Sequence, residues 1–488
     1  MAGENEKKEQ VIIPEKLPAR TDFVRWYNRV IELAEIVDRR YDVKGTFVWM
    51  PYGLKLMKNI VKKWDRLFQE NGIEETYFPL FVPLKYAQKN DKWFEGFKKN
   101  LYAAVPFISE QGEEKLIIRP TGEPAMYPIF RLWIRDGKLP IKIYQTVSSF
   151  RLEGRTTHTM IRDREITFWY EIHTAHKTKE EAYEEMQRHI KINEHIWKNI
   201  LNIPPIAVEK PKYELFPGAE SAVEFYIILP DGRLLENGSV NNLGQAYAKK
   251  FDLSYVDKDG NKHYCWQVCT GNGARYLVAA MALHGDERGL VVPPSIAPIQ
   301  AVIIPIYTKE QKKEIKAHAL EIKEMLLKGG IKACVDESER TAGEKFYVWD
   351  IKGVPIRIEV GRKELASKEY AVFRRDEKKR YSVKQNELVT FIKKVLQREM
   401  PDHLYKKVEQ FYKEKIKYFT STEEALRWIK KGGVAKVHWC ESEPCYEELV
   451  SLEKAIEPTG SLLDDHSKGR CIICGKETEK LTLVGRGY

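Results

Sequence analysis

The residues best suited to chemistry lie in an arginine-rich segment between residues 150 and 173. Attack of a carboxylate on the α-phosphate of ATP builds negative charge, which preorganised arginines and a metal ion can stabilise. Arginines on two strands and their connecting loop would form such a clamp. The segment alone fits equally well an antiparallel hairpin with a solvated basic tip. Its charged, histidine and tryptophan residues include Arg151, Glu153, Arg155, His158, Arg162, Arg164, Glu165, Trp169, Glu171 and His173.

A second candidate phosphate site is the stretch Gly-Asn-Gly-Ala-Arg at residues 271–275, which precedes an apolar run. Small residues and an arginine at a helix start favour phosphate, because the first backbone amides of a helix have no partner within it. The stretch has neither the lysine of a P-loop nor the spacing of a dinucleotide-binding fingerprint. It therefore excludes the two commonest nucleotide-binding motifs at this position and establishes nothing more.

The cysteines and two histidines are candidate metal ligands. Four of the seven cysteines form two close pairs separated by a loop, which is the spacing of a structural zinc site. Four protein ligands leave no open position for catalysis, so the metal would stabilise a small domain with little core. No carboxylate or cysteine completes a set beside His173 and His176, and we interpret both as hydrogen-bonded pocket histidines. The predicted zinc ligands are Cys440, Cys445, Cys471 and Cys474.

The apolar pattern predicts the elements that position these residues. Residues 139–175 give strand signals on both sides of the polar stretch 153–164, which is typical of antiparallel strands joined by a long loop. Thr178 and Glu181 form a capping box before an amphipathic run. We expect further helices at 53–71, 183–201, 275–284, 309–327 and 401–417, and strands at 75–82, within 223–255, at 301–306 and at 332–336.

Length and composition indicate more than one domain. The chain has 488 residues, of which 43% are hydrophobic, enough for more than one core. Its longest apolar stretches fall far short of the roughly 20 residues that cross a bilayer. Residues 1–10 have neither the apolar core of a secretory signal nor the acid-poor bias of a transit peptide, so we expect a cytoplasmic protein. A net charge of +10 permits a polyanionic partner without requiring one.

Taken together, these segments resemble the signature motifs of class II aminoacyl-tRNA synthetases, and most closely the archaeal and eukaryotic type of prolyl-tRNA synthetase. The resemblance runs from about residue 23 to residue 488. Chance does not place so many motifs in one order. Beside the arginine-rich segment, the matching stretches are residues 77–79 (YFP), 119–123 (RPTGE), 173–176 (HTAH), 242–245 (NLGQ), 284–290 (HGDERGL) and 293–298 (PPSIAP).

The resemblance implies ATP-dependent activation of an amino acid with Mg²⁺, and it assigns roles to individual residues. Arg151 would contact the α-phosphate and the amino-acid carboxylate, while Arg162 and Arg275 contact the outer phosphates. Arg151 and Arg275 would then be the catalytic pair. The other expected ATP contacts are Glu153, Glu236, Ser239 and Gly273. We expect Glu236 to help hold Mg²⁺, because an anionic side chain there favours a hard cation. The expected amino-acid contacts beside Arg151 are Thr121, Glu123, Trp169, Glu171, His173, Asn241 and Thr270.

The same resemblance implies a mixed α/β (α+β) fold in three domains. Residues 1–298 would form the class II catalytic domain on an antiparallel sheet. Residues 299–400 would form an α/β anticodon-binding domain, and residues 401–488 a small zinc-binding α+β domain.

The implied partners are a tRNA, proline or a related amino acid, and a second copy of the chain. Phe346, Asp350 and Arg357 would contact unpaired anticodon bases by stacking and by hydrogen bonds to base edges. The family usually has Glu where Asp350 stands. Pro79 would lie at a homodimer interface, and Tyr488 would pack its carboxylate into the protein.

Departures from the family pattern gather in the amino-acid pocket. The family commonly has Gln, Thr and His where Glu236, Ser239 and Asn241 stand, and an aromatic residue in place of Thr270. If Asn241 and Thr270 face the substrate, the pocket is wider or wetter than one shaped to proline. Elsewhere, His158 and Gly122 replace the usual Arg and Ser.

Three interpretations compete. The chain could activate proline with an altered pocket, or be a paralogue that activates a different amino acid or a proline analogue, or be an inactive tRNA-binding protein. Retention of Arg151, Glu153, Arg162 and Arg275 argues against the third, because a non-catalytic protein has no chemical need for them. We favour proline activation.

Overall fold

The computed structural model describes residues 15–109, 112–154 and 156–488. Arg155 and residues 1–10, which entered the expectations above, lie outside these ranges. Among the described residues, most long strands belong to one 11-stranded sheet of order β20-β21-β25-β22-β9-β10-β11-β14-β8-β7-β3. Its central pairs are antiparallel, which confirms the expected catalytic sheet. The strands are β3 (Glu74–Glu75), β7 (Ile141–Phe150), β8 (Glu165–His176), β9 (Ile206–Glu209), β10 (Ser221–Ile228), β11 (Arg233–Gly244), β14 (Trp266–Asn272), β20 (Ile416–Tyr418), β21 (Val434–His438), β22 (Ile456–Leu462) and β25 (Leu481–Gly487).

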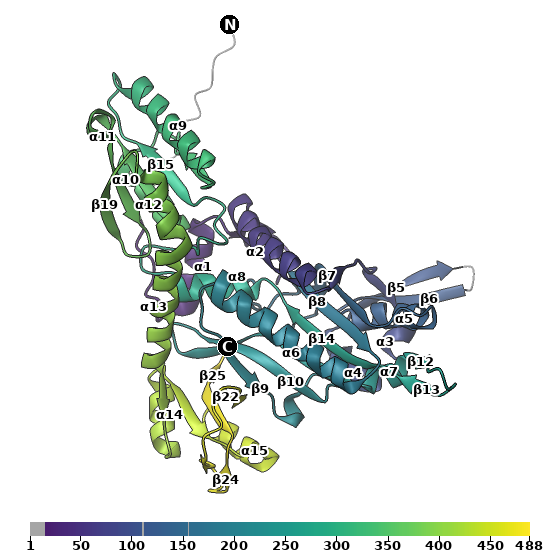
Figure 1. Cartoon of the computed structure of the whole chain (residues 1–488). Helices are drawn as coiled ribbons and strands as arrows, with labels where there is room; N and C mark the ends of the chain where they lie inside the picture. Colours follow the sequence, from purple (N-terminus) through teal and green to yellow (C-terminus); the bar gives the residue numbers. More distant parts are fainter. Residues whose placement is uncertain (1–14, 110–111, 155) are drawn as a thin grey trace.

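Helices cover both faces of this sheet. Helices α2 (Pro51–Glu70), α6 (Lys179–His195) and α8 (Arg275–His284) contribute to the core on one face (Figure 1). Helices α5 (Glu123–Arg135) and α7 (Ala246–Phe251) pack on the other face. The acidic pocket described below lies on the α5 face.

The helix signals in the sequence were accurate for α2, α6 and α8. Helix α6 begins at the predicted capping box, where Glu181 N donates to Thr178 Oγ1 at 3.1 Å, and it passes into a π-helical turn, Ile196–Ile200. Helix α8 has the predicted bounds and is buried along all of its length beyond Arg275. Such a helix lies within the core, because it is apolar on nearly every side.

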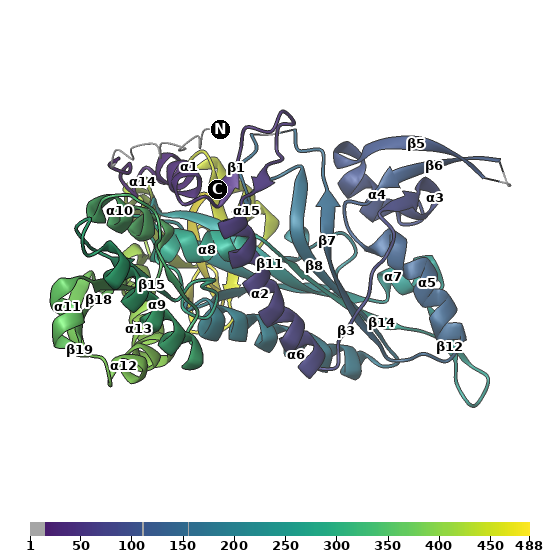
Figure 2. The same ribbon diagram turned by 90° about the horizontal axis from the view of Figure 1, so that it is seen from above.

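The expected strand over residues 75–82 is wrong. The segment contributes only the short β3 to the large sheet and β4 (Phe81–Pro83) to a separate sheet of order β4-β6-β5. Pro79 lies between the two strands, where a residue without an N–H donor interrupts pairing. In Figure 2, the sheet with β5 (Tyr102–Ser109) and β6 (Gly112–Ile118) lies at one end of the molecule.

A separate α/β unit follows residue 300. Its sheet has the order β16-β15-β17-β18-β19, with parallel pairs on both sides of β15 and antiparallel pairs beyond β17. The unit lies at the end of the catalytic sheet away from β5 and β6 (Figures 1 and 2). Its elements are β15 (Ala301–Pro305), α9 (Lys312–Lys328), β16 (Ala333–Val335), α10 (Ala342–Lys352), β17 (Ile356–Val360), α11 (Arg362–Ser367), β18 (Glu369–Arg374), β19 (Lys379–Lys384) and α12 (Leu388–Lys394).

The C-terminal segment is less separate than the proposed boundary at residue 401 suggests. After α13 (Met400–Lys415), strands β21, β22 and β25 continue the catalytic sheet, because β22 pairs with β9 and β25 pairs with the start of β11. The segment therefore shares backbone hydrogen bonds with the catalytic core. Its helices are α14 (Thr422–Lys430) and α15 (Glu443–Ser451), and its small hairpin joins β23 (Gly469–Arg470) to β24 (Glu477–Thr478).

The remaining elements are short or peripheral. None of the helices within the described ranges combines the length and apolarity needed to cross a membrane. These elements are α1 (Phe23–Leu33), β1 (Val37–Asp38), β2 (Val48–Trp49), α3 (Leu84–Ala87), α4 (Asp91–Phe97), β12 (Ser254–Val256) and β13 (Lys262–Tyr264), with 3₁₀ turns at Lys98–Asn100 and Lys212–Glu214 and a π-helical turn at Val395–Glu399.

Candidate active site

The arginine-rich loop and the start of α8 enclose a cavity of about 150 Å³ on the catalytic sheet. Ser239 is the one expected ATP contact that does not line it. Basic residues from the β7–β8 connection therefore meet the start of α8, as a phosphate site requires. The expected residues that line the cavity are Arg151, Glu153, Arg162, Glu236, Gly273 and Arg275; Met160, Asp163, Trp169 and Asn272 also line it.

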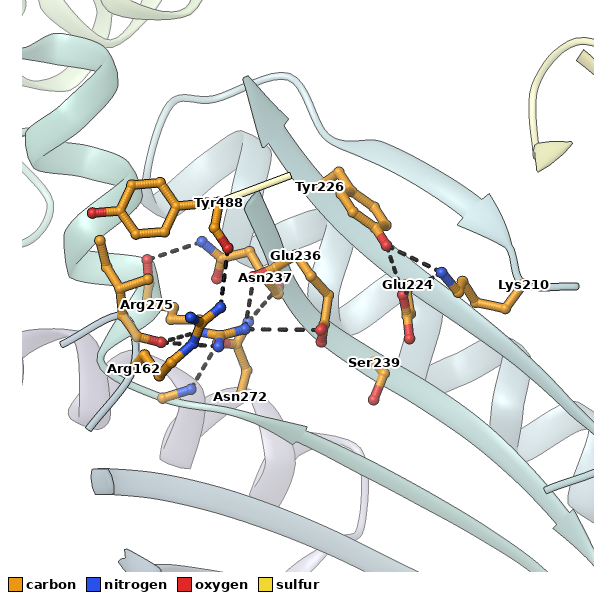
Figure 3. A network of polar contacts seen from close by, with 12 residues as sticks. Arg162, Lys210, Glu224, Tyr226, Glu236, Asn237, Ser239, Asn272, Arg275 and Tyr488 are labelled. Atoms are coloured by element: carbon orange, nitrogen blue, oxygen red, sulfur yellow. Dashed lines mark hydrogen bonds and ion pairs between the residues drawn. The ribbon is translucent and has the colours of Figure 1, made fainter. Parts of the chain in front are cut away.

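Main-chain oxygens fix Arg275 at this cavity (Figure 3). Its Nη1 donates to the carbonyl oxygen of Glu236 at 2.8 Å, and its Nε and Nη2 donate to that of Ile161 at 3.1 and 2.9 Å. The Glu236 carboxylate is 3.9 Å from Nη1 and its side chain is 44% exposed. Arg275 is thus preorganised as a fixed cation, while the carboxylate of Glu236 stays accessible.

Arg151 lies where the cavity meets a cluster of buried acids. Its guanidinium is 5.5 Å from the Phe97 ring and 5.8 Å from the Trp169 ring, and its Nε donates to the carbonyl of Pro120 at 3.3 Å. Burial, aided by Arg275, lowers the pKa of Arg151, while Glu171 and other acids oppose this shift. The side chain thus interacts with both Arg275 and the acidic pocket.

Glu123, Glu171 and His173 form the acidic pocket, with their ligand atoms all within 4.8 Å of one another. Glu171 accepts hydrogen bonds from Gly122 N at 2.6 Å and from Gln145 Nε2 at 3.2 Å. His173 Nδ1 is 3.1 Å from the Tyr127 hydroxyl. Two carboxylates therefore do lie beside His173, which corrects the sequence-based statement that none completes its set.

The two carboxyl groups of this pocket differ in electrostatics. Burial opposes ionisation of Glu171, but hydrogen bonds and charge from His173, with Arg119 and Gly122 N, outweigh it and lower the pKa. Burial raises the pKa of Glu123. The Glu123 Oε2 atom is buried and has no hydrogen-bond partner among the described residues. An ammonium group would supply that partner and favour the ionised form.

Asn241 and Thr270 lie on opposite faces of the sheet. Asn241 pairs with Cys269, which pairs with His173, so these side chains share the pocket face. Thr270 is the next residue along β14, and its hydroxyl lies 2.8 Å from His189 Nδ1 of α6. The expectation that Thr270 lines the amino-acid pocket is therefore corrected.

The amide nitrogen of Asn241 is bonded to side chains on the pocket face. Its Nδ2 donates to Ser239 Oγ at 3.0 Å and contacts Cys269 Sγ at 3.7 Å. Burial raises the pKa of Cys269, so the thiol is protonated. His176, by contrast, is bonded to Thr174 on the α6 face, 2.9 Å from Nε2 to Oγ1. It lies outside the pocket, unlike His173.

Three further residues, Gln145, Tyr127 and Cys269, hold or line the pocket and were not predicted from the sequence. Gln145 was detectable as a polar residue at a buried strand position, since such groups need a hydrogen-bond partner. Tyr127 and Cys269 carry no local signal that separates them from ordinary core residues.

The three expected anticodon contacts lie together on α10 and β17. The Arg357 guanidinium carbon is 4.1 Å from the ring centroids of both Phe346 and Phe373, and its Nη1 donates to Asp350 Oδ1 at 2.7 Å. The Arg357 side chain is 6% exposed and that of Asp350 is 16% exposed. Arg357 is therefore largely buried, and it holds Phe346 and Asp350 in place at the surface.

The four expected zinc ligands also come together. All four Sγ atoms lie within 4.8 Å of one another, and those of Cys440 and Cys474 are 3.8 Å apart. Tetrahedral zinc with Zn–S bonds of about 2.3 Å sets S···S distances of about 3.8 Å. The donor set and its spacing fit a structural zinc ion.

Comparisons with known proteins agree with this geometry. Residues 105–284 match the tRNA synthetase class II core domain (G, H, P, S and T), residues 300–395 match an anticodon binding domain, and residues 422–488 match the C-terminal domain of prolyl-tRNA synthetase. The chain is thus a class II aminoacyl-tRNA synthetase.

Relatives define the family within that class. The chain is 39% identical to a proline–tRNA ligase from Methanopyrus kandleri, covering 96% of each, and 37% identical to one from Thermococcus kodakarensis, covering 96% of this chain and 98% of that protein. A Giardia lamblia prolyl-tRNA synthetase in complex with prolyl-adenylate superposes with a TM-score of 0.91 at 30% identity, covering 98% of this chain and all of that one. The chain belongs to the prolyl-tRNA synthetase family.

Proposed function

We propose that this chain activates proline with ATP to form prolyl-adenylate, and then transfers the prolyl group to a proline tRNA. The observation that carries the proposal is the position of Arg151, which interacts with Arg275 and also with Glu123 and Glu171. Such a site holds phosphates on one side and a cationic amine on the other. Family membership supports proline as the amino acid.

In the first step, a carboxylate oxygen of proline attacks the α-phosphorus, and the bond to the bridging oxygen breaks to release pyrophosphate. Arg151 stabilises the charge that develops at the α-phosphate, and Arg162 and Arg275 hold the outer phosphates. Glu123 and Glu171 orient the amine, so that the carboxylate is presented in line. In the second step, a ribose hydroxyl of the tRNA attacks the prolyl carbonyl and AMP leaves.

Two metal ions fit this proposal. The accessible carboxylate of Glu236 suits a hard cation at the cavity, so Glu236 would help to hold Mg²⁺, which neutralises phosphate charge when bound. Ser239 lies on the same strand but bonds Asn241 instead of lining the cavity, which leaves Glu236 as the main protein ligand. Zinc would be held by Cys440, Cys445, Cys471 and Cys474.

A different amino acid is the second candidate. Activation of a different amino acid would require both Asn241 and Thr270 to face the substrate. Thr270 bonds His189 on the other face, and the Asn241 amide is bonded within the pocket wall, so less unmatched polar surface faces the substrate. This arrangement favours proline over a larger or more polar amino acid.

The proposed partners follow from the same residues. Phe346 and Asp350 would contact the anticodon, with Arg357 holding them in place. A homodimer would form through the segment around Pro79, where Tyr77 is 79% exposed and Phe81 is 49% exposed. We place the protein in the cytoplasm, where a tRNA-charging enzyme meets its substrates.

The test is ATP–pyrophosphate exchange with proline in an Arg151→Ala variant. We expect exchange to be abolished while tRNA binding, measured by filter retention, is largely kept. The matched control is Arg131→Ala, because Arg131 is 54% exposed and pairs with Asp252 away from the cavity. Exchange by Arg151→Ala near the wild-type rate would remove the catalytic assignment.

A further inference from the structure

A buried ion pair joins the catalytic domain to the anticodon-binding domain. Arg375 directly follows β18, and Asp286 lies two residues after α8. The guanidinium donates through Nη1 and Nη2 to the two carboxylate oxygens of Asp286, each at 2.7 Å. Their side chains are 1% and 6% exposed. A two-point contact of this kind fixes orientation as well as distance.

The same arginine also contacts the candidate anticodon site. Its Nε donates to the main-chain oxygen of Asp350 at 3.1 Å, in the last turn of α10. The Asp350 carboxylate accepts from Arg357 at 2.7 Å. Asp350 is thus held by Arg357 through its side chain and by Arg375 through its backbone. A guanidinium near a helix C-terminus is favourable, because the last carbonyls of the helix carry partial negative charge.

Main-chain hydrogen bonds between the segment after α8 and the end of α10 form a seam beside this ion pair. Leu290 N donates to Ile351 O and Val292 N donates to Gly353 O, both at 3.0 Å. Gly289 (φ +133°) and Gly353 (φ +70°) allow the approach, since a Cβ on either would lie 2.4 Å from backbone atoms across the seam. The end of α10 and the segment after α8 therefore cannot slide past each other without breaking these bonds.

Helix α8 carries this connection to the reacting phosphates. It begins at Arg275, which lines the ATP cavity, and ends at His284, next to the Asp286 turn. Its residues beyond Arg275 are all buried, so the helix cannot bend toward solvent. A shift of α10 on binding an anticodon would thus reach Arg275 through Arg375, Asp286 and one rigid helix.

From these contacts we infer that Arg375, with Asp286, couples anticodon occupancy to the active site. Arg375 is a positioning residue: it touches no substrate, and it fixes the end of α10 relative to α8. The inference rests on the proposed function, because it assumes that tRNA binds at Phe346 and Asp350. The coupling should raise kcat for a tRNA with the correct anticodon without changing the affinity for tRNA.

Neighbouring Arg374 provides a matched control. It is also buried and paired, but its partners Asp376, Glu377 and Glu399 all belong to the anticodon-binding domain or the helical segment that follows it. A variant of Arg374 loses a buried arginine of similar exposure without cutting the contact between domains.

The experiment compares charging of a proline tRNA transcript with charging of the same transcript carrying a substituted anticodon. For Arg375→Gln and Asp286→Asn, we expect the ratio of the two kcat values to fall by about tenfold, within the usual range of coupling between sites. KM for the cognate transcript and proline-dependent exchange without tRNA should stay near wild type. Arg374→Gln should keep the wild-type ratio.

The outcomes separate the inference from the proposed function. A purely structural role for Arg375 would slow both transcripts alike and leave the ratio unchanged, which would overturn the inference. If Arg375→Gln does not fold, as judged by thermal unfolding, Arg375→Lys keeps the charge but not the planar fork that makes the two-point contact with Asp286, and it should show a smaller loss of the same ratio. Absence of proline-dependent exchange in the wild type would instead contradict the proposed function.

A double-mutant cycle provides an independent check. Arg357→Ala should itself lower the kcat ratio, because it releases Asp350. If both arginines act through Asp350, adding Arg375→Gln to that variant should change the ratio little, whereas independent effects would multiply. Multiplicative effects would contradict the inferred route.

Discussion

Arg162 Nη2 donates a hydrogen bond to the main-chain oxygen of Tyr488 at 3.0 Å, which ties the arginine-rich loop to the residue after β25 (Figure 3). The Tyr488 hydroxyl lies 3.1 Å from His158 Nδ1, and the Arg233 guanidinium is 4.2 Å from its ring centroid. One residue of the C-terminal segment thus supports a loop that lines the proposed ATP cavity.

Replacing Tyr488 with Ala should therefore weaken ATP binding. The substitution removes the hydroxyl that contacts His158 and the ring that packs against Arg233, so the main-chain oxygen that Arg162 bonds is no longer held in place. We expect KM for ATP in pyrophosphate exchange to rise by about tenfold, the size of a weakened hydrogen bond to a charged group. KM for proline should change little, because the acidic pocket lies elsewhere on the sheet. Tyr488→Phe, which keeps the ring, should have a smaller effect. An unchanged KM for ATP in Tyr488→Ala would argue against this support.

The Asp286–Arg375 pair predicts a dependence of stability on pH. Burial opposes ionisation of Asp286, but the hydrogen bonds from Arg375 outweigh it and lower the pKa from 3.8 to about 2. Because the folded-state pKa is depressed, the stabilisation is present above pH 3.8 and is lost as the pH falls toward 2. The free energy of unfolding of wild type minus that of Asp286→Asn should shrink by about 2 kcal/mol over this range, measured by urea titration. A difference independent of pH would contradict the assignment.

Because β22 and β25 continue the catalytic sheet, we expect loss of zinc to affect activation as well as the C-terminal segment. Cys471→Ser should lower the zinc content from about one ion per chain, the stoichiometry of a four-thiolate site, and lower the midpoint of thermal unfolding. The rate of ATP–pyrophosphate exchange should fall together with the zinc content. Cys334→Ser, which changes a cysteine outside the cluster, is the control. Full zinc retention in Cys471→Ser would rule out the site.

The opposite placement of Thr270 and Asn241 predicts different effects of their substitution. Thr270→Val leaves His189 without its hydroxyl partner and should cost about 1–3 kcal/mol of stability, while KM for proline stays near wild type. Asn241→Ala enlarges the pocket face and should raise KM for proline. Exchange kinetics and thermal unfolding measure both variants. If KM for proline rose in Thr270→Val but not in Asn241→Ala, the placement of Thr270 outside the pocket would be contradicted.

Much of the fold could be predicted because its signals are local. The capping box of Thr178 and Glu181 marks the start of α6, and the apolar run after Arg275 gives the bounds of α8. The strands on both sides of the arginine-rich loop follow from their composition. The paired cysteines likewise carry their spacing in the sequence, and the structure brings them together.

The remaining features depend on long-range contacts. A shift of one residue along a strand moves a side chain to the other face of the sheet. The face on which Thr270 lies therefore depends on how β14 pairs with β8 and β11, and this register cannot be read from the local sequence. The pairing of β25 with β11 joins residues about 250 positions apart, and no local pattern predicts it. The Arg375–Asp286 pair likewise joins residues that are far apart in the sequence, so no local pattern predicts it.

Specificity constants for pyrophosphate exchange across the natural amino acids and proline analogues give the most direct test of proline activation. We expect proline to lead the panel by a wide margin, because Thr270 is outside the pocket and Asn241 is bonded to Ser239. A preference for another amino acid would contradict the proposed substrate. No exchange with any amino acid would contradict catalysis itself.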